Sequence, residues 1–105
     1  MSVIGRRLKA ARLRAGLSQE RLGLEIGLEA ESASARMNRY ETGARVPALE
    51  LIERVASTLN MPAAYFYTSD DLVAEILCAV HVLPVMARQE VLSVASGLAD
   101  IARQQ

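Results

Sequence analysis

Side chains that can hydrogen-bond to nucleic acid gather in one short segment of the chain. Arg36, Asn38 and Arg39 fall within four residues, and Arg45 follows soon after. Arginine makes two parallel hydrogen bonds to guanine or binds a phosphate, and asparagine pairs in the same way with adenine. Together with Ser34, the first three of these residues predict a surface that reads base edges, and Arg45 predicts a phosphate contact.

Some of these residues also fit other roles. Arg36 precedes the apolar Met37 and can face the neighbouring loop, and Arg39 can bind a phosphate without reading sequence. Ser32 and Ser34 both fit the cap of a helix, and a hydroxyl used as a cap is lost to DNA. The sequence leaves these alternatives open.

The residues that most often carry catalysis are isolated. The sole histidine, His81, and the sole cysteine, Cys78, lie in one apolar stretch without the third member of a catalytic triad. They also lack the neighbours of a metal site, and a single cysteine excludes an internal disulfide. We therefore expect no enzyme, no metal and no cofactor.

Charge divides the chain into two unlike halves. The formal net charge is zero over 105 residues, but residues 1–46 hold nine Arg or Lys and five Glu, whereas residues 47–105 hold three Arg and seven Asp or Glu. The halves therefore carry +4 and −4, which predicts a basic, phosphate-binding surface on the first half. No apolar run approaches the roughly 20 residues that span a bilayer, so we expect a cytoplasmic protein without a membrane partner.

Apolar spacing predicts helices throughout, with almost no strand signal. Caps and breakers divide the chain: Ser2 and Gly16 bound a first helix, Ser18 and Gly27 a second, Ser32 and Thr42 a third, and Pro47 and Asn60 a fourth. A short helical turn is expected at 63–66, and Pro84 separates two further helices that follow Ser69 and Asp70. The fourth helix is expected to bury Leu49, Ile52, Val55, Ala56 and Leu59.

An ordered set of residues within positions 4–66 has a familiar spacing. The set is Gly5, Leu8, Arg12, Gly16-Leu17-Ser18-Gln19, Leu22, Gly27, Met37-Asn38-Arg39-Tyr40-Glu41-Thr42-Gly43, Pro47 and 52–59. In this order it resembles the Cro/C1-type (XRE) helix-turn-helix regulators of bacteria and phages. The resemblance implies an all-α fold, with a five-helix lambda-repressor-like domain over residues 1–68 and two C-terminal helices over residues 69–105.

The resemblance also implies roles for individual side chains. The second helix is expected to cross the DNA backbone while the third enters the major groove, and Arg12 and Glu41 are expected to form an ion pair. The expected phosphate contacts are Ser18, Gln19, Arg14, Tyr40, Thr42 and Arg45. Tyr40 is expected to keep most of its ring in the core. Arg6, Arg7 and Lys9, on the first helix, are expected to form a solvated face.

The spacing between the second and third helices departs from this family. About four extra residues lie between Gly27 and Glu41, so either the turn is longer or the third helix begins earlier. Glu29 and Glu31 fall in this segment, where they can repel phosphates or stabilise the start of a helix. Both alternatives remain open at the level of sequence.

The C-terminal segment carries two apolar stripes on either side of Pro84. We expect them to form a homodimer surface made of Leu72, Ile76, Val80, Leu83, Val91, Val94, Leu98 and Ile101; the alternative is that they complete the monomer core. Two copies can read two half-sites of double-stranded DNA, which predicts a repressor on a pseudo-palindromic operator. A protein-interaction adaptor and the antitoxin of a toxin–antitoxin module are the alternatives, with a toxin or an antirepressor as protein partner.

Overall fold

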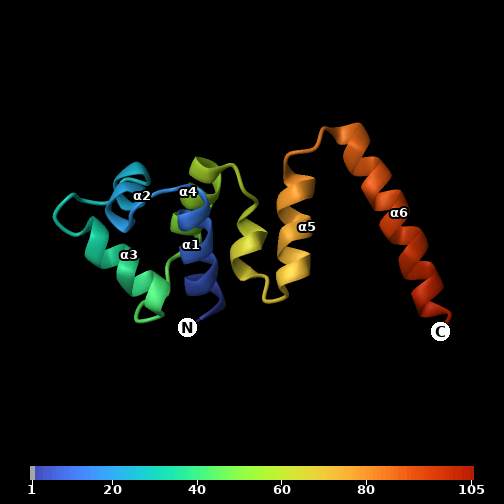
Figure 1. The fold of residues 1–105 in the computed structure, drawn as a ribbon, viewed down its shortest axis with the longest axis horizontal. Helices are drawn as coiled ribbons and strands as arrows, with labels where there is room; N and C mark the ends of the chain where they lie inside the picture. Colours follow the sequence, from blue (N-terminus) through green and yellow to red (C-terminus); the bar gives the residue numbers. More distant parts are fainter. Residues whose placement is uncertain (1) are drawn as a thin grey trace.

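The computed structural model describes residues 2–105, and over that range every regular element is a helix. The elements are α1 (Val3–Arg14), α2 (Gln19–Glu25), α3 (Ala33–Thr42), α4 (Leu49–Leu59), the 3₁₀ helix η1 (Ala63–Tyr67), α5 (Asp71–His81) and α6 (Val85–Arg103). Figure 1 shows α1 to α4 and η1 gathered at one end, α5 beside η1, and α6 standing apart. The predicted all-α fold is confirmed.

Local signals set most helix ends. The side chains of Ser2, Ser18 and Asp70 each accept a hydrogen bond from a backbone N–H three residues further on, so these three N-caps form as predicted. Gly16 and Gly27, after α1 and α2, have φ angles of +72° and +92°. Because L side chains rarely adopt such angles, glycine allows both turns.

Two predicted details of the helices are wrong. Ser32 occupies the N-cap position of α3, but its hydroxyl makes no capping bond and lies 3.5 Å from the carbonyl oxygen of Glu29. Its backbone is not in the extended conformation that aims a capping side chain at the helix. Leu49 is 54% exposed because it begins α4 at the edge of the buried stripe, and Leu51 enters the core instead.

The core joins α1, α2, α3, α4 and η1. Its largest fully buried side chains are Leu8, Leu22, Met37, Ile52, Val55, Tyr65 and Phe66. Tyr65 and Phe66 meet edge to face with ring centroids 5.1 Å apart, and such pairs add to the stabilisation from burial alone. From the C-terminal helices, Ala74 is buried in this core and the half-buried Cys78 packs against it.

The extra residues between α2 and α3 lengthen the turn and not the helix. The turn covers residues 26–32, and it is anchored by Ile26 and Leu28, which are 3% and 7% exposed. The N–H of Leu28 also donates to the carbonyl oxygen of Gly23 at 2.9 Å. Glu29 and Glu31 lie exposed on this turn. The position of α3 is therefore fixed by buried apolar residues on both sides of the extra segment.

The C-terminal helices form an arm. Helix α5 lies against η1, whereas α6 buries none of its 19 residues and makes no extended packing contact with another described element (Figure 1). The stripe on α6 therefore does not complete the core of the single chain. No described helix combines the length and apolarity that crossing a membrane would require.

Candidate nucleic-acid interface

Helix α3 has one buried face and one exposed polar face. Ala33, Met37, Tyr40 and Glu41 are buried, and Ser34, Ala35, Asn38, Arg39 and Thr42 are exposed. Residues three and four apart lie on the same side of a helix. Three of the four residues predicted to read bases, Ser34, Asn38 and Arg39, therefore share one face of α3 that is open to solvent.

Arg36 lies on the flank of this face. Its Nη2 donates to the hydroxyl of Tyr40 at 3.0 Å, and its guanidinium carbon lies 6.0 Å from the centre of that ring. Tyr40 is 9% exposed, so its ring packs in the core while its hydroxyl reaches the surface. The contact directs Arg36 along the helix toward Tyr40.

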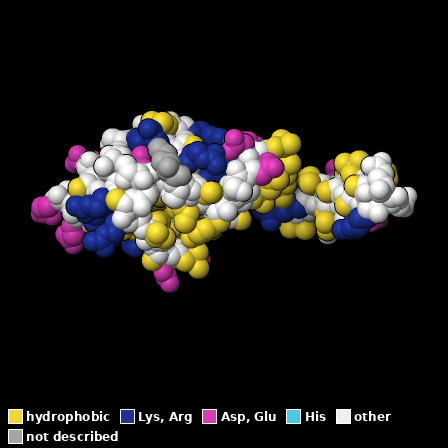
Figure 2. Space-filling view, turned by 90° about the horizontal axis from the view of Figure 1, so that it is seen from below, with side chains coloured by type: hydrophobic (Ala, Val, Ile, Leu, Met, Phe, Trp, Pro, Cys, Tyr) yellow, Lys and Arg dark blue, Asp and Glu magenta, His cyan; other side chains and the backbone are white. Residues whose placement is uncertain are grey.

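Three arginines surround a small hollow beside α3. Arg36, Arg39, Tyr40 and Arg45 line a space of about 190 Å³. No carboxylate lines it, and the structure of residues 2–105 shows no ion pair for Arg39 or Arg45. Guanidinium groups without a carboxylate partner attract phosphate oxygens. Figure 2 shows Lys and Arg side chains at the end of the molecule that holds α2 and α3, with Asp and Glu side chains beside them.

Gln19 connects the start of α2 to the exposed face of α3. Its Nε2 donates to Oδ1 of Asn38 and to Oε1 of Glu41, both at 3.2 Å. The hydroxyl of Ser18, the preceding residue, caps α2 and is exposed. Gln19 therefore positions Asn38, while Ser18 stays at the surface next to it.

A buried ion pair locks α1 against α3. Nε of Arg12 lies 2.7 Å from Oε2 of Glu41, and Nη2 donates to the second carboxylate oxygen at 3.1 Å. Nη1 donates to the carbonyl oxygen of Leu17. The helices meet at Gly5, where a Cβ would collide with the carbonyl oxygen of Glu41. The role of Arg12 in this chain is therefore structural, in the ion pair that the resemblance implies.

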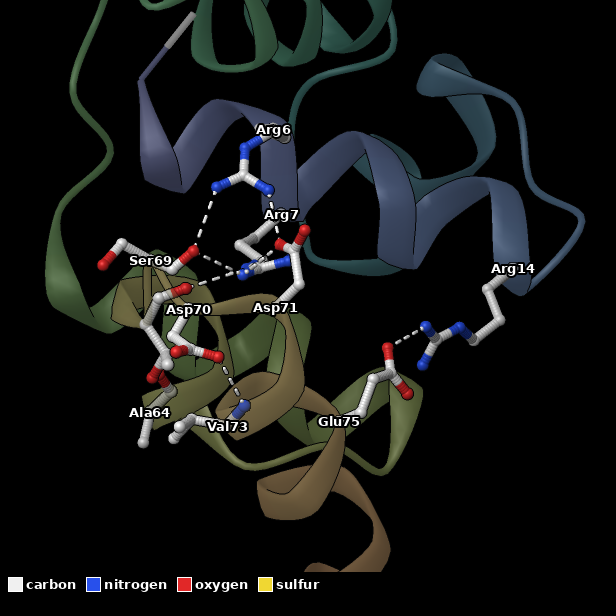
Figure 3. Close-up of polar contacts among 10 residues, drawn as sticks. Arg6, Arg7, Arg14, Ala64, Ser69, Asp70, Asp71, Val73 and Glu75 are labelled. Carbon is white, nitrogen blue, oxygen red and sulfur yellow. Dashed lines mark hydrogen bonds and ion pairs between the residues drawn. The ribbon is translucent and has the colours of Figure 1, made fainter.

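Helix α1 presents only part of the solvated basic face that its sequence predicted, because Arg6 and Lys9 are exposed whereas Arg7 is buried. Arg6 pairs with Asp71 at 2.8 Å, Arg7 is 5% exposed, and Arg14 pairs with Glu75 at 2.6 Å (Figure 3). The Glu75 carboxylate raises the pKa of Arg14 above its ordinary value. Arg14, predicted to contact a DNA phosphate, is therefore paired with α5 through an exposed ion pair.

Sequence reasoning missed Arg7, although a signal for its burial was present. Ile4, Arg7, Leu8 and Ala11 have the three- and four-residue spacing of one helix stripe. Arg7 therefore lies among the inward-facing residues of α1, where a charged side chain needs specific partners. The charge of Arg7 suggested that its side chain faces solvent, whereas its position on the apolar stripe indicated that it faces the core.

The isolated histidine and cysteine both lie on α5. Burial raises the pKa of the half-buried Cys78 thiol above its ordinary value. Among the described residues, no three His, Cys, Asp or Glu side chains lie close enough to share a metal ion.

Comparisons with known proteins agree with this geometry. A helix-turn-helix domain family model matches residues 3–65. The crystal structure of the transcriptional regulator BswR superimposes with a TM-score of 0.83 at 40% sequence identity, covering 96% of this chain and 98% of that one. No curated protein matches the sequence. The chain therefore belongs to the helix-turn-helix family of DNA-binding transcription regulators.

Proposed function

We propose that this chain is a sequence-specific repressor that binds a pseudo-palindromic operator as a homodimer, with one α3 in each of two successive major grooves. The observation that carries the proposal is the exposed face of α3, where Asn38 and Arg39 stand beside arginines without carboxylate partners. A major groove admits one α-helix, and its base edges match these side chains.

The side chains divide into base and phosphate contacts. Ser34, Asn38 and Arg39 read bases from the centre of the exposed face. Arg36, which the sequence had also suggested for base reading, binds phosphate instead, because Tyr40 holds it toward the hollow. The remaining phosphate contacts are Ser18, Gln19, Tyr40, Thr42 and Arg45, at the edges of the same face.

The occupant we propose for the arm is a second copy of this chain. Ile76 of α5 and Val91, Val94 and Leu98 of α6 line an apolar groove of about 450 Å³. The predicted dimer residues along the arm are exposed or half-buried in the single chain, at 72% for Leu72 and 64% for Leu98. Figure 2 shows hydrophobic side chains along this arm. Exposed apolar surface of this extent marks an interface, and a two-fold dimer buries the same stripe on both copies.

The dimer is tested by charging its apolar face. Leu98→Glu should convert the dimer to a monomer in sedimentation velocity, whereas Leu13→Glu should not, because Leu13 is similarly exposed at 58% but lies on α1. Loss of the second half-site contact should weaken operator binding by about 10²- to 10⁴-fold. A monomeric wild-type protein would refute the dimer.

Sequence-specific binding is tested with DNA from upstream of the coding sequence and with random duplex, each at two salt concentrations. The proposal predicts a tight, salt-sensitive complex that prefers the upstream DNA by about 10³-fold or more. Equal affinity for both duplexes at both salts would reject sequence-specific repression and favour an adaptor whose arm binds another protein.

A further inference from the structure

The contact between α1 and α5 is built around one buried arginine. Nε of Arg7 donates to the carbonyl oxygen of Thr68 at 2.9 Å, and its Nη2 lies 3.1 Å from the carbonyl oxygen of Ser69 and 2.9 Å from Oδ1 of Asp71. The guanidinium also stands over the Tyr65 ring, 5.4 Å from its centre. One planar group thus holds the end of η1, the connecting segment and the first residue of α5.

Two further arginines of α1 extend this contact along α5. Arg6 donates to Oδ1 of Asp71 at 2.8 Å and to the carbonyl oxygen of Ser69 at 3.3 Å. Arg14 reaches Glu75, one helical turn beyond Asp71, at 2.6 Å. Figure 3 shows Arg6 and Arg7 converging on Asp71 while Arg14 meets α5 separately. Two separated points of attachment fix both the position and the rotation of a helix.

Apolar packing alone does not fix α5 in this way. Ala74 is the only fully buried residue of α5, and the half-buried Cys78 packs beside it against the core, so the contact of this helix with the core rests on two small side chains. The opposite side of α5 is apolar and exposed, and it contributes Ile76 to the groove proposed for the second copy. Helix α5 thus stands between the arm interface and α1, which holds α3 through Arg12 and Glu41.

We propose that the contacts of Arg7 with residues 68–71 and of Arg14 with Glu75 set the distance and angle between the two α3 helices of the dimer. They therefore determine which half-site spacing the protein accepts. Arg7, Arg14 and Glu75 are positioning residues, and none of them touches DNA. This inference rests on the proposed homodimer and identifies the residues that determine which half-site spacing the dimer prefers.

The test uses the full-length protein and operators in which the half-site spacing is optimal or changed by two base pairs. Glu75→Arg places two arginines together, and Glu75→Arg combined with Arg14→Glu restores an ion pair. Arg7→Lys keeps the buried charge but lacks the fork that reaches three acceptors. Asp100→Arg breaks an exposed ion pair within α6, with Arg103, and is the matched control.

The expected result is a weaker preference for the optimal half-site spacing, with no loss of affinity for the half-site itself. Glu75→Arg and Arg7→Lys should reduce the preference for the optimal spacing by about tenfold, part of the gain that linked sites provide. Affinity for a single half-site should stay at the wild-type value. The charge-exchanged double variant should regain the preference, and Asp100→Arg should never lose it.

Different results overturn the two proposals. If wild type discriminates between spacings and the Glu75→Arg variant, folded and dimeric, discriminates equally well, the positioning role is wrong while the dimeric repressor stands. Failure of the charge-exchanged variant to restore the preference also rejects the role. If wild type itself shows no spacing preference, the proposed dimeric operator fails, and the positioning role fails with it.

Discussion

The arginines of α1 and those around α3 have opposite surroundings. Arg6, Arg7, Arg12 and Arg14 each lie within ion-pair distance of a carboxylate, whereas Arg39 and Arg45 have no such partner among residues 2–105. Three of the four paired arginines meet Asp71 or Glu75 of the acidic second half. The charges of the two halves therefore partly cancel where α1 meets α5, whereas the arginines beside α3 have no carboxylate partner among the described residues.

An excess of basic residues therefore does not by itself locate a DNA-binding surface. The charge of an arginine within reach of a carboxylate is balanced locally, while an arginine without such a partner keeps its attraction for phosphate. If the paired arginines of α1 and the unpaired arginines around α3 differ in function, variants of the two groups should have different effects, given below from the largest to the smallest.

The largest effect is expected for Glu41→Ala, which removes the carboxylate of the buried pair. The Arg12 guanidinium, with a side chain 11% exposed, would be left without its partner. Breaking a buried pair by removing one member costs about 3–5 kcal/mol of unfolding free energy. Urea denaturation measures the loss, with Glu75→Ala as the control, because exposed ion pairs contribute about 0–1 kcal/mol. A loss below about 1 kcal/mol for Glu41→Ala would mean that the pair does not hold α1 and α3 together.

Arg39→Ala should affect DNA and leave the fold intact. An arginine that reads a base contributes about 1–3 kcal/mol of specific binding, and surface substitutions change stability by about 0.5 kcal/mol or less. Competition binding to operators altered one base pair at a time measures the change, which should relax the preference at one position. Unchanged affinity would remove Arg39 from the reading set, and equal loss on all sequences would make it a phosphate contact.

Arg45→Ala should weaken binding to operator and random duplex alike. A phosphate contact carries no sequence information, so the ratio of operator affinity to random-duplex affinity should stay at the wild-type value. The slope of log K against log salt concentration should become shallower by about 0.9. A changed base preference in this variant would contradict the assignment of Arg45 to the backbone.

The smallest effect is expected for Asp71→Asn, which changes the carboxylate that pairs with Arg6 and Arg7. Hydrogen bonds from Arg6 and then Arg7 lower the pKa of the Asp71 carboxyl below its ordinary value. A carboxyl with a lowered pKa in the folded state stabilises the fold above its unfolded pKa, and this contribution is lost as pH falls through the lowered value. The variant should therefore be slightly less stable than wild type at pH 7, and the difference should vanish in strong acid.

Thermal unfolding at a series of pH values measures this difference, with Asp100→Asn as the matched control. A stability difference for Asp71→Asn that persists below the lowered pKa would show that the carboxylate charge is not its cause.

The sequence predicted the features that depend on neighbouring residues. Ser2, Ser18 and Asp70 cap their helices through contacts three residues away, and Gly16 and Gly27 end helices through their own backbone angles. Tyr40 was expected to keep most of its ring in the core, and it is buried. The residues of the exposed face of α3 follow from the same periodicity, although their contacts with DNA remain a proposal.

Features that depend on distant residues escaped the sequence. Arg7 meets carbonyl groups more than 60 residues away, and local charge gave no sign of them. Whether the extra residues lengthened the turn or α3 depended on the burial of Leu28 by the rest of the core. The exposure of Leu49 shows that apolar spacing along a helix does not predict which residues at the end of the helix lie outside the core.

The most direct test of this account compares salt dependence on a duplex with a single half-site. Each phosphate contact contributes about 0.9 to the slope of log K against log salt concentration. Removing Arg36 and Arg45 together should reduce the slope by about 1.8. Removing Arg6 and Arg14 together should leave it at the wild-type value. The account would be contradicted if both double variants reduced the slope equally, or if only the variant without Arg6 and Arg14 reduced it. Either result would mean that DNA binding is not confined to the arginines without carboxylate partners.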